Sequence, residues 1–156
     1  MAEKKIADKE YRVELLGAKD AYLLLAEIIR IAGPGAKHLP AIVALVRPDE
    51  EGAQFMADVA AFAACAEVLN THGAEALVDL KARVLGLAQV KRPAGHYEKI
   101  DLEVDFYGAL DQAEELFDYV MEVQFGNFSQ GSEASGPIAL AMVLVRNIFR
   151  IQKSSR

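Results

Sequence analysis

Three carboxylates, Asp101, Glu103 and Asp105, are the side chains whose types and spacing come nearest to a chemical site. They alternate with apolar residues between Ile100 and Phe106, a pattern that predicts a strand with all three carboxylates on one face. Paired carboxylates can transfer protons or bind a divalent cation. Because any half-buried strand shows the same alternation, we favour a solvated face over a metal site. A small helical metal-dependent enzyme that uses these three residues is the alternative that we rank last.

The other reactive side chains lack the spacing that catalysis or metal binding requires. His38, His72 and His96 are not paired at i+3 or i+4, so they do not form a helical metal motif. Cys65 is the single cysteine and lies at helical spacing in an alanine-rich run, which predicts a small buried core residue. The segment "GPGAKH" lacks the spacing of a phosphate-binding loop, and no serine lies in a nucleophile motif. We therefore predict no catalytic, cofactor-binding or metal-binding residues.

The composition predicts one folded domain over residues 1–156. Hydrophobic residues make up 53% of the 156, which is enough for a core, and the formal net charge is −6. An acidic chain is not expected to bind nucleic acid. The first ten residues, "MAEKKIADKE", are too charged for a secretory signal, and no apolar run approaches the ~20 residues of a membrane span. We expect a cytoplasmic protein that does not bind membranes.

Hydrophobic periodicity divides most of the chain into helices. Apolar residues recur every three or four positions in six segments, which predict helices at 18–32, 37–46, 55–70, 74–90, 107–125 and from Pro137 onward. Period-2 alternation predicts two short strands, 11–16 and 99–105, which can satisfy each other's backbone groups by pairing. We therefore predict a mainly α fold, a compact bundle of about five or six helices with a minor two-stranded β ribbon. Residues 1–10 and 129–136 are expected to be flexible.

Charge is segregated along the second half of the sequence. Between Glu98 and Glu122 there are nine acidic residues against Lys99, whereas Arg146 to Arg156 contains four basic residues and no acidic one. The basic tail can fold back onto the acidic helix, since cations are favoured near a helix C-terminus. Alternatively, one or both patches face another chain.

Aromatic and apolar residues near the end of the chain suggest a partner surface. Phe125 closes the predicted helix 107–125, and Phe128 follows it just before the segment "SQGSEASG". We expect Phe125 to pin the helix end to the core and Phe128 to contribute to a surface, although both could be core residues. The last helix is apolar around its whole circumference, so it is either central to the fold or covered by another copy or a client.

Two stretches of the chain resemble the tail assembly chaperones of long-tailed, siphophage-type bacteriophages. The first is "YRVELLGAKDAYLLLAEIIRIAGPG", in which an extended aromatic-basic start leads into a leucine-rich helix that ends in Gly-Pro. The second is "DFYGALDQAEELFDYVMEVQFGNF", which is similar to the acidic, aromatic helix of that family. Its matching residues are Glu122, Val123, Gln124, Phe125 and Phe128. Gln124 stands where the family pattern has Asn, and the segment beyond Gly136 is longer and more apolar than the resemblance explains.

The resemblance implies a non-enzymatic role without a cofactor. Such chaperones bind the long, helical, aggregation-prone tape measure protein before the tail tube polymerises around it. The tape measure protein is therefore the expected partner. The tail tube protein is a second candidate partner, and self-association is a further possibility. The competing hypothesis is a structural neck or tail-completion protein of a phage particle. The candidate partner-binding residues are Phe125, Phe128, Leu140, Val143, Arg146 and Arg150.

Overall fold

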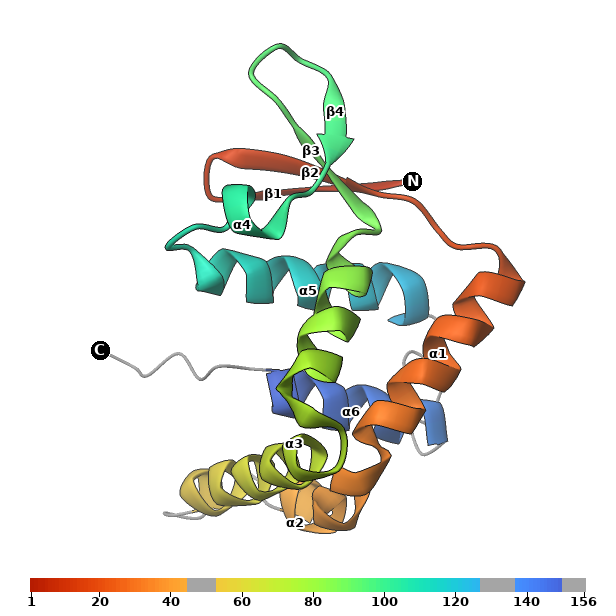
Figure 1. Cartoon of the computed structure of the whole chain (residues 1–156), viewed down its shortest axis with the longest axis vertical. Coiled ribbons are helices and arrows are strands. Elements are labelled where there is room, and N and C mark those ends of the chain that lie inside the picture. Colours follow the sequence, from red (N-terminus) through yellow and green to blue (C-terminus); the bar gives the residue numbers. More distant parts are fainter. Residues whose placement is uncertain (45–52, 127–136, 150–156) are drawn as a thin grey trace.

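A four-stranded antiparallel sheet lies at one end of the molecule, above a set of packed helices (Figure 1). The computed structural model describes residues 1–44, 53–126 and 137–149. The strands are β1 (Ala2–Ile6), β2 (Lys9–Val13), β3 (Ala88–Lys91) and β4 (Tyr97–Lys99), and they follow one another across the sheet in chain order. In the register of the sheet, Tyr11 lies opposite Lys4 on one side and Val90 on the other.

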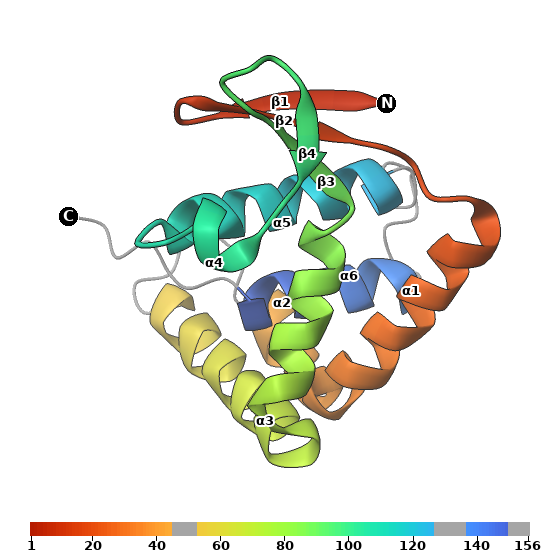
Figure 2. The same cartoon turned by 45° about the horizontal axis from the view of Figure 1, so that its top comes forward.

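The helices pack beneath this sheet. They are α1 (Ala18–Ala32), the 3₁₀ helix η1 (Gly33–His38), α2 (Leu39–Ala44), α3 (Ala53–Leu85), α4 (Leu102–Asp105), α5 (Leu110–Phe125) and α6 (Pro137–Phe149). Helix α5 underlies the sheet in both views (Figures 1 and 2). Buried side chains of strands and helices, among them Tyr11, Val90, Ile28 and Phe117, form one hydrophobic core. No described helix is long and apolar enough to cross a membrane.

The predicted fold class is wrong, because the structure is mixed α/β rather than a helix bundle with a minor two-stranded ribbon. Strand β2 does occupy part of the predicted strand 11–16, but it pairs with β1 and β3. The first ten residues, expected to be flexible, contain β1 and the start of β2. Strand β1 was missed because its sequence carries no apolar alternation, and only its Ile6 is fully buried.

The predicted strand 99–105 is also wrong, since most of it forms the short helix α4. Asp101 explains the difference, because its side chain accepts hydrogen bonds from the backbone N–H groups of Glu103 and Val104. Such N-capping satisfies donors that a strand would pair with a neighbour. Only Lys99 of the predicted strand belongs to a strand, at the end of β4.

The predicted helices are largely confirmed, although several of their ends differ, and α5 begins at Leu110 rather than at Tyr107. Helix α1 has the predicted bounds, and the segment predicted as helix 37–46 is shared by η1 and α2. The predicted helices 55–70 and 74–90 are the two halves of α3, which turns sharply at Gly73 with φ 79° and ψ 165° (Figure 2). The second half ends at Leu85 rather than near Val90, because the chain leaves the helix at Gly86 and enters β3.

Candidate functional site

The first half of α3 exposes a row of large apolar side chains. Phe55 is 69% exposed, Val59 46%, Phe62 77% and Leu69 38%. Together with the half-buried Ala66, they lie at positions that share one face of a helix. We call these five residues the α3 outer face, and Met56, which is 53% exposed, borders it. In Figures 1 and 2 this half of α3, drawn in yellow, lies at the edge of the molecule.

The inner face of the same helix half is made of small residues. Ala57, Ala60, Ala64 and Val68 are buried and face the rest of the protein. A Cβ atom added at Gly35 of η1 would lie 3.1 Å from the Ala64 carbonyl oxygen and 3.4 Å from Val68 Cγ2. Because η1 approaches α3 so closely, larger side chains would not fit between them. In this arrangement the small residues of the inner face pack against the core, while Phe55 and Phe62 remain exposed to solvent.

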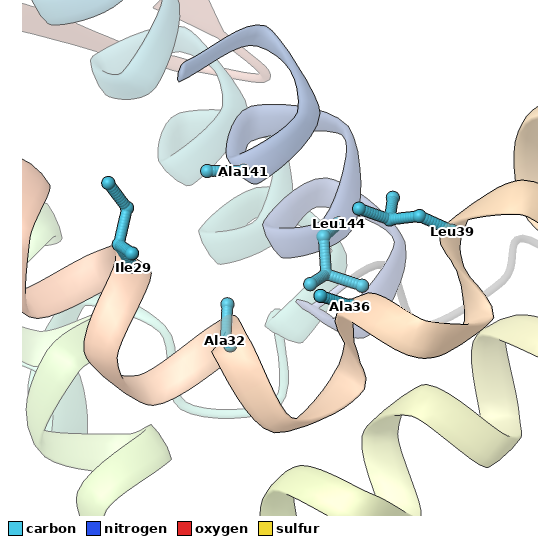
Figure 3. Close-up of a pocket in the computed structure, with 7 residues that line it drawn as sticks. Ile29, Ala32, Ala36, Leu39, Ala141 and Leu144 are labelled. Atoms are coloured by element: carbon cyan, nitrogen blue, oxygen red, sulfur yellow. The ribbon is translucent and has the colours of Figure 1, made fainter. Parts of the chain in front are cut away.

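An apolar pocket lies between α1, η1, α2 and α6. Its volume is about 230 Å³, and Figure 3 shows its wall formed on one side by α1, η1 and α2 and on the other by α6. The lining residues are Ile29, Ala32, Gly33, Ala36, Leu39, Ala141 and Leu144. None of these side chains can donate or accept a proton, so the pocket can receive apolar groups but offers no acid-base chemistry.

The predicted partner-binding residues differ in their exposure, and some of them lie outside the described residues. Phe125 is 2% exposed, which agrees with its predicted role in pinning the end of α5 to the core. Val143 is 36% exposed, and Arg146 Nε lies 4.0 Å from Asp118 Oδ1 of α5. Phe128, Arg150 and the side chain of Leu140 lie outside the described part of the structure. Partner binding by these residues stays a prediction.

Cations from other elements contact the acidic face of α5. Lys4 of β1 lies 3.2 Å from Glu115, and Lys81 of α3 forms an ion pair with Glu114. Burial raises the pKa of Glu114, while the Lys81 ammonium acts in the opposite direction. With the Arg146 contact to Asp118, three elements approach this face. Of these three cations, Arg146 alone belongs to the basic segment 146–156, so these contacts support the intramolecular interpretation for Arg146 only.

The three carboxylates that were predicted to share a strand face have separate roles. Asp101 caps α4, and Glu103 lies exposed within it. Asp105 is buried and accepts hydrogen bonds from the Arg92 guanidinium, including Nη2 to Oδ2 at 3.0 Å, and from the Asp101 N–H at 2.9 Å. Burial acts to raise the pKa of Asp105, but Arg92 and the Asp101 N–H outweigh it and hold the pKa below its ordinary value. Among the described residues, no group of three His, Cys, Asp or Glu side chains is placed to hold a metal ion.

His72, His96 and Cys65 occupy structural positions. His72 Nε2 lies 3.1 Å from the Arg30 carbonyl oxygen, and His96 Nε2 lies 2.7 Å from Glu98. Cys65 is half-buried rather than fully buried, and that burial raises the pKa of its thiol. A low thiol pKa favours nucleophilic reactivity, so Cys65 lacks this mark of a reactive cysteine.

Sequence periodicity found the residues of the α3 outer face but not their exposure. The apolar row from Phe55 to Leu69 predicted a helix, without indicating which side of that helix faces the core. A second row of the same period, from Ala57 to Val68, lies on the opposite side of that helix and is the one that is buried. The close approach at Gly35 decides between the two rows, and it depends on residues far away in the sequence.

Comparison with known proteins identifies one family. The family model described as "Phage tail assembly chaperone protein, TAC" matches residues 7–136, which is well over half of the chain. No curated protein and no solved structure shows significant similarity to the chain.

Proposed function

The chain belongs to the phage tail assembly chaperone family, and we propose that it binds and solubilises the tape measure protein while the tail is assembled. The α3 outer face is the observation that supports this proposal best. A chaperone of an aggregation-prone helical protein needs an apolar surface that stays exposed in its own folded state. The phenylalanines at 55 and 62 provide such a surface, because the core is complete without them.

Binding through this face requires no covalent chemistry. Burying an exposed Phe or Leu side chain contributes roughly 1.5–3 kcal/mol, so a few such contacts can hold a client against aggregation. The net gain is smaller than their sum, because association costs translational and rotational freedom. A reversible complex of this kind suits a chaperone that leaves its client before the tail is complete.

Co-expression tests the proposal. The tape measure protein encoded by the same phage should be largely insoluble when expressed alone. With this chain it should be soluble and should co-purify through a tag on either protein. If the tape measure protein remains insoluble and no complex forms, the proposed function is wrong.

The composition of finished particles separates the proposal from the structural hypothesis. A neck or tail-completion protein would remain in purified virions, whereas an assembly chaperone would leave. We expect mass spectrometry of purified virions to detect tail tube protein but not this chain. Stoichiometric amounts of the chain in virions would favour the structural role.

A further inference from the structure

We propose that the α3 outer face binds an amphipathic helix of about four turns whose apolar stripe is bordered by lysine and arginine. This inference rests on the proposed function and specifies which part of a client the chain recognises. It combines the length and shape of the face with the charge of the residues around it.

The face has the length and regularity of a helix-binding surface. From Phe55 to Leu69 it spans 14 helical steps, or about 21 Å at 1.5 Å per residue. The only non-helical backbone angles within α3 occur at Gly73, beyond the end of the face. Its apolar side chains therefore form one straight ridge. A second helix can pack along such a ridge over its whole length, whereas a loop or a single side chain would cover only part of it.

The charged side chains that α3 itself contributes around the face are acidic. From Ala53 to Leu80, helix α3 contains no lysine or arginine but four acidic residues, which are Asp58, Glu67, Glu75 and Asp79. Asp58 lies three residues after Phe55 and four before Phe62, and so borders the face directly. Glu67 lies nearer the inner face and is already paired with Lys37 of η1 at 2.9 Å, so it does not form part of the border. Beyond the turn at Gly73, Glu75 and Asp79 are exposed.

This charge distribution favours a basic client helix over a second copy of the chain. A helix with basic borders brings opposite charges to the edge of the contact, which increases the association rate and suppresses wrong partners. If two copies paired through their α3 outer faces, the same acidic borders would meet. The net charge of −6 also opposes such pairing. The apolar ridge then supplies most of the affinity, and the acidic border selects among apolar helices.

Two designed peptides of about 18 residues can test the inference directly. Both carry the same apolar stripe at i, i+4, i+7, i+11 and i+14, but one is bordered by lysine and the other by glutamate. Fluorescence anisotropy measures their binding to the full chain and to two variants. Phe62→Ser alters the α3 outer face, whereas Tyr107→Ser alters an aromatic residue that is 91% exposed outside α3. Both substitutions affect exposed side chains, so the fold should be unchanged.

We expect the lysine peptide to bind at least about tenfold more tightly than the glutamate peptide, with a difference that shrinks in high salt. Phe62→Ser should weaken lysine-peptide binding at least about tenfold, and Tyr107→Ser should leave it unchanged. Equal binding of the two peptides would overturn the inference, as would full binding by Phe62→Ser. An oligomer of the chain alone that Phe62→Ser dissociates in sedimentation would assign the face to a second copy and also overturn it.

The outcomes for this inference and for the proposed function can be distinguished. If the parent chain and Phe62→Ser both solubilise the tape measure protein, the proposed function stands and the assignment to α3 fails. If the lysine peptide binds as expected but the tape measure protein stays insoluble, the helix-binding face stands and its proposed client is wrong.

Discussion

Asp105 is a buried charge that is paired with Arg92, a residue of the hairpin formed by β3 and β4. Arg92, which directly follows β3, reaches across to the Asp105 carboxylate and also contacts Glu98 at 2.9 Å. This ties α4 to the hairpin. Removing one partner of a buried pair is more harmful than losing an exposed pair, because the remaining charge is left without compensation.

We therefore predict that Arg92→Leu lowers the free energy of unfolding by about 2 kcal/mol or more at pH 7. Lys91→Leu is the matched control, since Lys91 and Glu10 form an exposed pair at 3.1 Å, and it should change stability little. Urea denaturation of the two variants and the parent measures the difference. Equal effects of the two substitutions would contradict the role assigned to Arg92.

The pair of Asp105 and Arg92 also predicts how the stability of the protein changes with pH. The pKa of Asp105 is held below its ordinary value of 3.8, so its contribution to stability is fully present above that pH. It is lost as the pH falls through the lowered pKa of the folded state. The stability difference between the parent and Arg92→Leu should therefore narrow below about pH 4. A difference that widens with acidification would show that Asp105 is not the group responsible.

Gln124 forms a two-point contact with the segment between β2 and α1. Its Oε1 accepts a hydrogen bond from the Leu16 N–H at 3.0 Å, and its Nε2 donates to the Glu14 carbonyl oxygen at 2.7 Å. Gln124→Glu has the same shape but places a carboxylate oxygen against that carbonyl. We expect it to cost about 1–2 kcal/mol at pH 7, and less at pH 4 when the new side chain is partly protonated. Thermal unfolding at pH 7 measures the effect. If Gln124→Glu is as stable as the parent, this contact does not stabilise the fold.

At the scale of elements, long periodic segments were predictable and short pairings were not. The 15 residues of α1 repeat their apolar pattern over four turns, and its predicted bounds are confirmed. The pairing of β2 with β3 joins residues such as Tyr11 and Val90, and nothing in either local sequence specifies that partner. In α4, one capping side chain, Asp101, outweighs the period-2 pattern. Local pattern therefore predicted the helices, while tertiary contacts decided the sheet.

The break in α3 gives a prediction about two glycines. Gly73 has φ 79° and ψ 165°, a conformation that only glycine adopts without strain. Gly73→Ala should therefore cost about 1–2 kcal/mol. Gly126→Ala is the matched control, because Gly126 is right-handed, with φ −59°, and an added Cβ there would make an ordinary contact with Glu122 Cγ at 3.5 Å. It should be neutral or stabilise by up to about 1 kcal/mol. Denaturant unfolding measures both variants. A control that unfolds at lower denaturant concentration than Gly73→Ala would contradict the geometry at Gly73.

At the scale of the whole molecule, the family could be recognised from the sequence although the fold could not. The stretches that carried the resemblance, 11–35 and 105–128, lie within the region matched by the family model. They contain α1 and α5, whose periodicity is strong. The surface that we assign to the client could not be located in the same way. Whether Phe62 faces the core or the solvent depends on the fit between Gly35 and Ala64, which only the structure shows.

The soluble fraction of co-expressed tape measure protein tests the central claim, that the α3 outer face is the client-binding surface. Phe55→Ser with Phe62→Ser removes both phenylalanines from this face. Tyr22→Ser with Tyr107→Ser removes two tyrosines that are 66% and 91% exposed elsewhere. Both double variants should keep the melting temperature of the parent within a few degrees. We predict that the phenylalanine variant leaves most of the tape measure protein insoluble, while the tyrosine variant performs like the parent. The opposite result, or equal activity of the two variants, would contradict the claim.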